Sequence, residues 1–189
     1  MIKLSILVLT TPRRVNNMFS ELMKELDKQI GNKKDIEVLG LYDNKTKSVG
    51  EKRNNLVSLA KGQFLCFIDD DDRIDDSYIE SIMSAIDQNP SADCICFGCE
   101  TTVNGADKHF SKYSISYEYE RIGDQWRGKP SHTMVWRSAI AKKYSFPVVN
   151  YNEDVPWVMK AHKDIKNEIQ IDKILYYYIF DSNISETRS

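Results

Sequence analysis

The stretch Phe64–Asp72 constrains the fold of this chain most, because five apolar residues lead directly into four consecutive aspartates. An apolar run of this length is consistent with a strand that is buried on both faces of a sheet. Four adjacent carboxylates repel one another, so they favour a solvent edge or a bound cation. Ligands of open α/β sheets bind beyond the carboxyl ends of the strands. The stretch therefore predicts a divalent-metal site at the mouth of a sheet.

Length and composition indicate one ordinary globular domain. The 189 residues are 41% hydrophobic and 29% charged, and the formal net charge of −2 gives no sign of a strongly basic nucleic-acid binder. No apolar run approaches the roughly 20 residues that span a bilayer. The segment 2–9 is too short for a secretory leader. We therefore expect a cytoplasmic protein without a transmembrane segment.

The cysteines are expected to pack in the core. Cys94, Cys96 and Cys99 form a C-x-C-x2-C cluster that suggests zinc, but no second ligand pair follows at a suitable spacing. Cys94 and Cys96 also alternate with apolar residues, as small side chains on a strand do. Reduced cysteines are consistent with the cytoplasm.

Strand and helix patterns alternate at short intervals over the first half of the chain. Apolar runs typical of strands occupy 3–9, 36–42, 64–68 and 94–98. Apolar residues at helical spacing lie between these runs, over 15–30, 49–60 and 79–86. The alternation predicts an α/β fold with a mostly parallel, doubly wound central sheet and right-handed crossovers.

The second half changes character. Asn104-Gly105 between β-prone runs predicts a hairpin. A helix whose Val155, Val158 and Met159 face the core is expected over 152–162. The other expected elements are a mobile loop over 120–131, a strand over 134–137, a helix to 143, and two final strands over 168–172 and 174–180.

The acidic run Asp69–Asp72 has two other interpretations. One is a solvated turn without function. The other is a calcium loop, but Ile74 then occupies the sixth position, where such a loop needs glycine, and a strand precedes the run instead of a helix. Hard oxygen ligands at a flexible strand end suit Mg²⁺ or Mn²⁺ shared with a phosphate.

Two further polar clusters stand on either side of this run. Lys52-Arg53 lie near the start of a helix, where backbone N–H groups also favour anions. Glu153-Asp154 lie at the start of a later helix, where adjacent carboxylates often only complement the helix dipole. Taken alone, each cluster is also explained as an ordinary charged part of a helix.

Taken in order, these features resemble the family 2 glycosyltransferases, which have a GT-A fold. Asp43 matches the acidic residue that ends their second strand, and Lys52-Arg53-Asn54 is similar to their Ala-Arg-Asn-like segment. Asp69–Asp72 matches their Asp-x-Asp-Asp run, and Glu153-Asp154 matches the acidic pair about 80 residues later. The ending, a tyrosine run at 176–178 followed by Asn183-Ile184-Ser185, is similar as well.

The chain also departs from the family pattern. Thr10-Thr11-Pro12-Arg13 stands where the family has Pro-Thr-Tyr-Asn, and Asp43-Asn44-Lys45 stands where it has Asp-Gly-Ser. Both segments lie where the base and ribose would bind, so the nucleotide stays open. Ile179-Phe180 follows the tyrosine run in place of the common arginine, which removes one candidate phosphate contact.

The resemblance implies a GT-A-like (Rossmann-related) sheet flanked by helices, with a smaller antiparallel region on the acceptor side. Residues 1–100 would form the nucleotide-sugar-binding half and residues 101–189 the acceptor-side half of the same domain. The implied activity is a metal-dependent, inverting transfer of a sugar from a nucleotide-diphosphate donor to an acceptor hydroxyl. The implied cofactor is Mg²⁺ or Mn²⁺.

The resemblance also implies roles for particular residues. Asp154 is expected to be the catalytic base, with Glu153 orienting acceptor or sugar. Asp71, with Asp69, is expected to hold the metal, while Asp70 or Asp72 contacts the ribose or supports the loop. The residues expected to contact the nucleotide sugar are Thr10, Arg13, Asp43, Lys52, Arg53, Asp69, Asp70 and His132. His162 is either a functional group or a cap at the end of its helix.

The acceptor and two other function classes stay open. A saccharide or lipid-linked sugar is the favoured acceptor, and a modified nucleic-acid base or a protein side chain are the other options. A nucleotidyltransferase of related fold also uses acidic metal ligands, but its phosphate loop is usually rich in glycine, and residues 10–14 contain none. The third class is an inactive nucleotide- or sugar-binding module.

Overall fold

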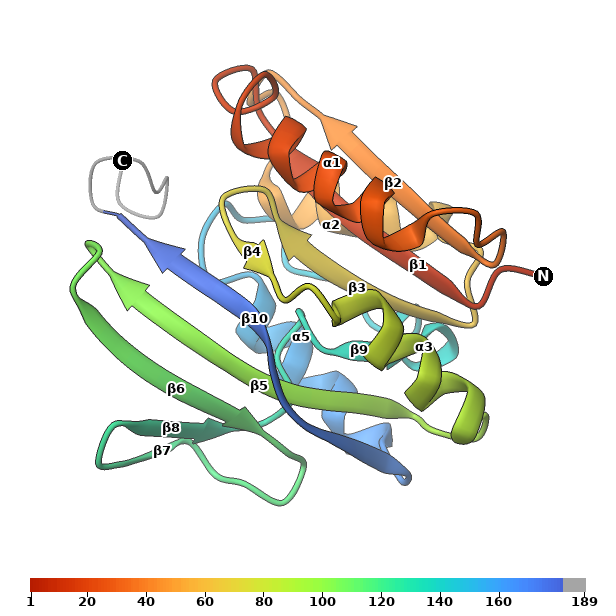
Figure 1. Cartoon of the computed structure of the whole chain (residues 1–189), viewed down its shortest axis with the longest axis vertical. Coiled ribbons are helices and arrows are strands. Elements are labelled where there is room, and N and C mark those ends of the chain that lie inside the picture. Colours follow the sequence, from red (N-terminus) through yellow and green to blue (C-terminus); the bar gives the residue numbers. More distant parts are fainter. Residues whose placement is uncertain (182–189) are drawn as a thin grey trace.

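The first half of the chain builds the parallel part of the sheet, as the alternation predicts. Three strands run parallel in the order β2-β1-β3, with the bounds β1 Leu4–Thr10, β2 Ile36–Tyr42 and β3 Phe64–Asp69. Leu9 of β1 is in register with both Leu41 and Asp69. The carboxyl ends of the three strands therefore meet at one edge (Figure 1).

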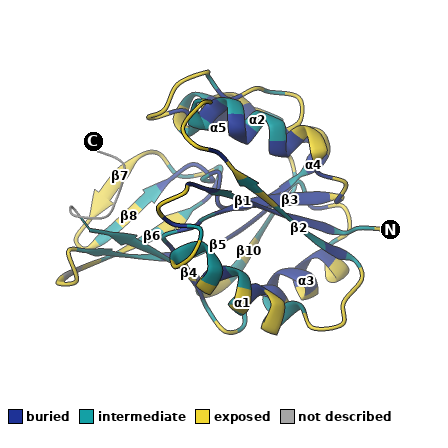
Figure 2. Ribbon diagram, turned by 90° about the horizontal axis from the view of Figure 1, so that it is seen from above, coloured by how far each residue is buried: buried dark blue, intermediate teal, exposed yellow. Residues whose placement is uncertain are grey.

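Helices cover both faces of this sheet. Figure 2 shows α1 and α3 on one face and α2, α4 and α5 on the other. Their bounds are α1 Met18–Ile30, α2 Val49–Leu59, α3 Tyr78–Gln88, α4 Ser138–Ala141 and α5 Asp154–Ala161. α1 begins three residues later than its apolar spacing predicts, because the chain first turns with the N–H groups of Arg14 and Val15 donating to Thr11 O.

The second half of the chain is interleaved with the first. β9 (Val135–Arg137) lies between β3 and β5 (Cys94–Val103) and runs antiparallel to both (Figure 1). β10 (Glu168–Phe180) pairs parallel with β5 and antiparallel with the short β4 (Arg73–Ile74). The two predicted final strands are wrong in one respect. β10 is continuous, because shifts of register around Ile174 let it pass the polar residues 172–173 without ending.

The predicted hairpin is confirmed, and the predicted loop after it is wrong. Asn104 and Gly105 have φ angles of 48° and 73°, as a type I′ turn requires, and they join β5 to β6 (Asp107–Tyr113). Residues 120–128 are not a loop, because β7 (Glu120–Ile122) and β8 (Gln125–Gly128) continue the sheet beyond β6. Their polarity reflects exposure of this small extension.

The core confirms the interpretation of the apolar stretch and the cysteines. Every residue from Phe64 to Ile68 is 0% exposed, so β3 is buried on both faces. All four cysteines are free and buried. Among the described residues, 1–181, no three His, Cys, Asp or Glu side chains gather into a preformed metal cluster. The segment Asn183-Ile184-Ser185 lies outside those residues.

One face of α5 differs from the expectation. Val158 is buried as predicted, but Val155 and Met159 are 40% and 39% exposed. The buried face is set by Trp157, whose ring stacks on Phe146 at 4.7 Å between centroids. α5 is followed by a short 3₁₀ helix (His162–Asp164). No helix within residues 1–181 combines the length and apolarity needed to cross a membrane.

Candidate active site

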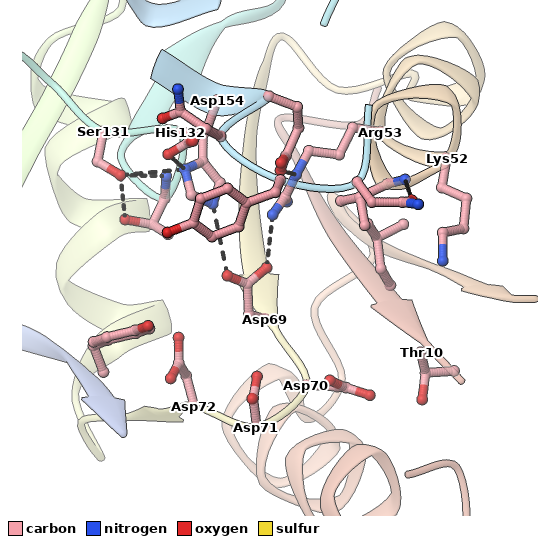
Figure 3. Close-up of a pocket in the computed structure, with 18 of the residues that line it drawn as sticks. Thr10, Lys52, Arg53, Asp69, Asp70, Asp71, Asp72, Ser131, His132 and Asp154 are labelled. Carbon is pink, nitrogen blue, oxygen red and sulfur yellow. Dashed lines mark hydrogen bonds and ion pairs between the residues drawn. The ribbon is translucent and has the colours of Figure 1, made fainter. Parts of the chain in front are cut away.

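A pocket of about 680 Å³ opens at the carboxyl ends of β1 and β3. Figure 3 shows side chains from both halves of the chain converging on it. The turn after β1, the start of α2, the acidic loop after β3, and the segments 131–133 and 150–155 all contribute lining residues. This is the edge of the sheet at which the sequence predicts a metal site.

Arg14 contacts two of the four aspartates directly. Its Nη1 lies 2.8 Å from Asp70 Oδ1, and its Nη2 lies 2.8 Å from Asp71 Oδ2. Burial raises the pKa of Asp71 to about 6, and the nearby Asp69 and Asp70 charges add to this, although the Arg14 cation opposes it. Negative charge at Asp71 is therefore incompletely balanced, which favours a further cation.

Asp72 ties the acidic loop to β10. Tyr176 OH donates to Asp72 Oδ2 at 2.6 Å, and the Ile179 N–H donates to Asp72 Oδ1 at 3.0 Å. The Asp69 N–H in turn donates to Tyr176 OH at 3.1 Å. Burial raises the pKa of Asp72 well above its usual value. Of the two roles expected for Asp72, these contacts favour support of the loop.

Arg53 joins the two acidic clusters that the sequence separates. Its Nε donates to Glu153 Oε1 at 2.8 Å, and its Nη2 lies 3.1 Å from Asp69 Oδ1. The guanidinium also lies 4.8 Å from the Phe67 ring centroid. Burial lowers the pKa of Arg53, but the two carboxylates outweigh burial and raise it, so the side chain stays charged. Arg53 thereby fixes the end of β3 against the start of α5.

His132 bridges Asp154 and Asp69. Its Nδ1 lies 3.1 Å from Asp154 Oδ2, and its Nε2 lies 3.7 Å from Asp69 Oδ2 (Figure 3). Burial and the Arg53 cation lower the pKa of His132. The two carboxylates outweigh both effects, so the pKa of His132 is raised from 6.5 to about 9. Burial also raises the pKa of Asp154, while His132 and Arg53 lower it to about 2. At neutral pH an imidazolium therefore lies between two carboxylates.

Asp43 lies behind the pocket wall. It accepts hydrogen bonds from Thr46 Oγ1 at 2.5 Å and from the Lys47 N–H at 3.3 Å, and Lys52 Nζ lies 3.6 Å away. The hydrogen bond from Thr46 is the main cause of the lowered pKa of Asp43. Asp43 therefore holds the 45–47 loop and Lys52, both of which contribute to the pocket lining.

Most of the predicted site residues come together in the pocket. Those that line it are Thr10, Lys52, Arg53, Asp69, Asp70, Asp71, His132, Glu153 and Asp154. Arg13 does not, because its side chain is exposed and Arg14 lies in the pocket instead. Sequence reasoning missed Arg14, since the signal, two adjacent arginines after Pro12, does not say which one turns inward. His162 Nδ1 lies 2.9 Å from Val158 O, which favours the capping interpretation.

The acidic loop offers suitable ligands for a divalent metal. The side chains of Asp69 and Asp71 are 28% and 18% exposed, so both retain access to the pocket. Carboxylate oxygens are the ligands that Mg²⁺ and Mn²⁺ prefer, and Mg²⁺ is commonly held by one or two carboxylates together with substrate phosphates. The donor set and the incompletely balanced charge at Asp71 fit such an ion.

Comparison with protein families decides the class of this chain. Residues 19–168 match the family described as "Glycosyl transferase family 2". The chain belongs to this family. The match covers the acidic loop, Arg53, His132 and the Glu153-Asp154 pair, so the resemblance inferred from the motifs is confirmed.

Solved structures show the same fold. TarS of S. aureus has 19% identity and a TM-score of 0.66, with 94% of this chain and 37% of TarS covered. The structure of TarS 1–349 in complex with UDP-GlcNAc has 19% identity and a TM-score of 0.68, with 98% of this chain and 60% of that chain covered. This protein thus spans 37% to 60% of their length. No curated protein sequence matches the chain. The expected α/β fold with a mostly parallel sheet is confirmed.

Proposed function

We propose that this protein is a metal-dependent, inverting glycosyltransferase that moves a sugar from a nucleotide-diphosphate donor to an acceptor hydroxyl. The observation that carries the proposal is the bridge by Arg53 and His132 between Asp69, at the end of β3, and Glu153-Asp154, before and in α5. Family membership supports it. A uridine diphosphate sugar is the first donor to test, because TarS structures contain UDP-GlcNAc and UDP.

Asp71 and Asp69 would hold Mg²⁺ or Mn²⁺. Such an ion, when bound, supplies positive charge that offsets the charge developing on the departing diphosphate. Lys52, which lines the pocket, adds a protein cation on the donor side. Arg53 is held by Asp69 and Glu153, so it positions these carboxylates. We assign Asp43 an indirect role in donor binding, through the 45–47 loop and Lys52.

Asp154 is the proposed base. The acceptor oxygen attacks the anomeric carbon while the bond from that carbon to the diphosphate oxygen breaks, and the hydroxyl proton passes to Asp154. Direct displacement inverts the anomeric centre. His132 and Arg53 lower the pKa of Asp154 to about 2, so Asp154 is a carboxylate at neutral pH. Glu153, held by Arg53, orients the acceptor or the sugar from the neighbouring position.

The test is a screen of nucleotide sugars for thermal stabilisation, followed by an assay of nucleotide release. We expect UDP and at least one UDP-sugar to raise Tm in the presence of Mn²⁺, with a smaller rise after chelation by EDTA. Slow release of UDP from the same donor should follow. The proposal fails if no nucleotide sugar binds or turns over.

The same assays separate the two other function classes. Release of pyrophosphate from a nucleoside triphosphate and a sugar phosphate would identify a nucleotidyltransferase. Tight nucleotide binding without turnover of any donor would identify an inactive module. A change of anomeric configuration, read by NMR of the transfer product, tests inversion.

A further inference from the structure

The pocket continues onto one face of the β5-β6-β8-β7 extension. Cys99 and Thr101 of β5 line the pocket and are in register with Tyr176 and Tyr178 of β10, which line it too. On the other side of β5, Cys99 is in register with Ser111 of β6. Residues in register across a sheet share a face. The face that lines the pocket therefore extends across β6.

Aromatic side chains follow this face outward. Tyr113, two residues after Ser111, lines the pocket. Ser111 is in register with Trp126 of β8, and Trp126 is in register with Arg121 of β7. Tyr119 packs on the same face of β8, because a Cβ at Gly128 would lie 2.8 Å from its ring. Tyr113, Tyr119 and Trp126 therefore form an aromatic face that begins at the pocket.

The aromatic face is accessible and begins beside the proposed base. Tyr119 and Trp126 are 55% and 45% exposed, which is unusual for side chains of their size. Tyr113 and Asp154 line the same pocket, and the Asp154 charge adds to burial in raising the pKa of Tyr119. The Arg121 guanidinium lies 5.7 Å from the Trp126 ring centroid, and its Nε donates to Gly123 O at 3.0 Å.

Of the four Lys and Arg residues in β6, β7 and β8, only Arg121 lies on the aromatic face. Lys108 and Lys112 alternate with the residues of the aromatic face, and Arg127 is in register with Lys112, so these three cations lie on the opposite face. Nucleic-acid binding depends on cations that contact successive phosphates. These three cations lie on the face opposite the aromatic side chains, so they would not contact the phosphates of a nucleic acid bound there. An aromatic surface with a few hydroxyls beside it suits the rings and hydroxyls of a saccharide.

We infer that the face carrying Tyr113, Tyr119 and Trp126 binds the acceptor, and that this acceptor is a saccharide chain whose rings stack on these side chains. The inference rests on the proposed function, because a protein has an acceptor only if it transfers a group. It names a sugar chain in place of a nucleic-acid base or a protein side chain. The chain's terminal hydroxyl reaches Asp154, and its further units lie along Tyr119 and Trp126.

Binding of soluble hexasaccharides tests the inference. Cellohexaose, maltohexaose and chitohexaose are titrated into the protein by isothermal calorimetry. We expect at least one to bind, with an affinity about tenfold lower in Tyr119→Ala and Trp126→Ala. Trp126→Phe should keep most of the affinity, because it keeps a ring. Ile122→Ala is the matched control, since Ile122 is in register with Gln125, on the opposite face, and is 51% exposed.

The inference is overturned if none of the three hexasaccharides binds the wild type, or if Ile122→Ala weakens binding as much as Trp126→Ala. Binding of a single-stranded oligonucleotide that Trp126→Ala abolishes would overturn it as well. Thermal stabilisation by UDP with Mn²⁺ is measured on the same variants and should not change. Failure of that donor measurement in the wild type counts against the proposed function, so the two failures are distinguishable.

Discussion

Asp154 carries the proposed proton transfer, and Asp154→Asn tests it. The amide has nearly the same shape but cannot accept the acceptor proton, so transfer should fall by about 10²- to 10⁴-fold. Donor binding should persist, since Asp154 is not expected to hold the metal. Initial rates of sugar transfer and the UDP-induced shift of Tm are measured together. Asp164→Asn, at a carboxylate paired with Lys143 outside the pocket, serves as control. Full transfer activity in Asp154→Asn would refute the assignment.

His132 is expected to make the protein less stable as the pH rises into the alkaline range. Its pKa is raised from 6.5 to about 9 in the folded state. A raised pKa stabilises the folded state fully below about pH 6.5, and this contribution is lost as the pH rises through 9. Between pH 6.5 and 9.5 the wild type should lose up to about 3 kcal/mol more unfolding free energy than His132→Asn. Urea denaturation at the two pH values measures this difference. Equal losses of unfolding free energy in the wild type and in His132→Asn would contradict the ion pairs.

Arg14 holds two aspartates that would otherwise repel each other. Removing one partner of a buried ion pair leaves uncompensated charge, so Arg14→Gln should lower the unfolding free energy by about 3 kcal/mol without metal. Mn²⁺ should restore more stability to this variant than to the wild type, because a cation replaces the guanidinium charge beside Asp71. Thermal denaturation with and without Mn²⁺ measures both effects. Arg13→Gln, at the exposed neighbour, is the control, and equal stability of the two variants would contradict the pairing.

At the scale of elements, the start of α2 supports the segment that leads to the acidic pair. The Gly50 N–H donates to Val149 O at 3.0 Å, and the Val49 N–H donates to Asn150 Oδ1 at 3.1 Å. A Cβ at Gly50 would lie 1.7 Å from Pro147 O. The backbone of residues 147–150 therefore lies against the helix at a position that only glycine allows.

Gly50→Ala should separate these two elements. We expect a loss of about 2 to 3 kcal/mol in unfolding free energy, because backbone rather than a flexible side chain blocks the new methyl group. Transfer activity should fall too, since Glu153 and Asp154 follow this segment. Chemical denaturation and initial rates measure the two effects. Leu59→Ala, at a 61% exposed position near the end of α2, should change neither strongly.

At the scale of the whole molecule, the two halves of the sheet depend on each other. β9 fills the space between β3 and β5, and β10 pairs with β5 along most of its length. A fragment of residues 1–100 would leave the backbone groups of β3 and β5 unpaired on these sides. We expect it to show no cooperative thermal unfolding by circular dichroism. Co-expression with residues 101–189 should restore it, and cooperative unfolding of the fragment alone would contradict a single domain.

The sequence was most informative where a structural feature depends on a recognisable pattern of residues. The apolar run before Asp69 predicts a buried strand, and the strand is fully buried. The Asn104-Gly105 pair predicts the hairpin, because few other residues adopt left-handed backbone at both positions. Most of the site residues predicted from the order of acidic and basic motifs line the pocket. The first two signals depend on neighbours in sequence, and the third depends on the order of short motifs along the chain.

Tertiary structure decided the rest. It placed Arg14 rather than Arg13 beside the aspartates, since the direction of either side chain depends on the dihedral angles of the turn after β1. It placed the strand expected over 134–137 between β3 and β5, and it formed β7 and β8 where a loop was expected, because short strands are stabilised by their partners more than by their own propensity. It also set His132 between Asp69 and Asp154, since only folding brings side chains so distant in sequence within reach of one imidazole.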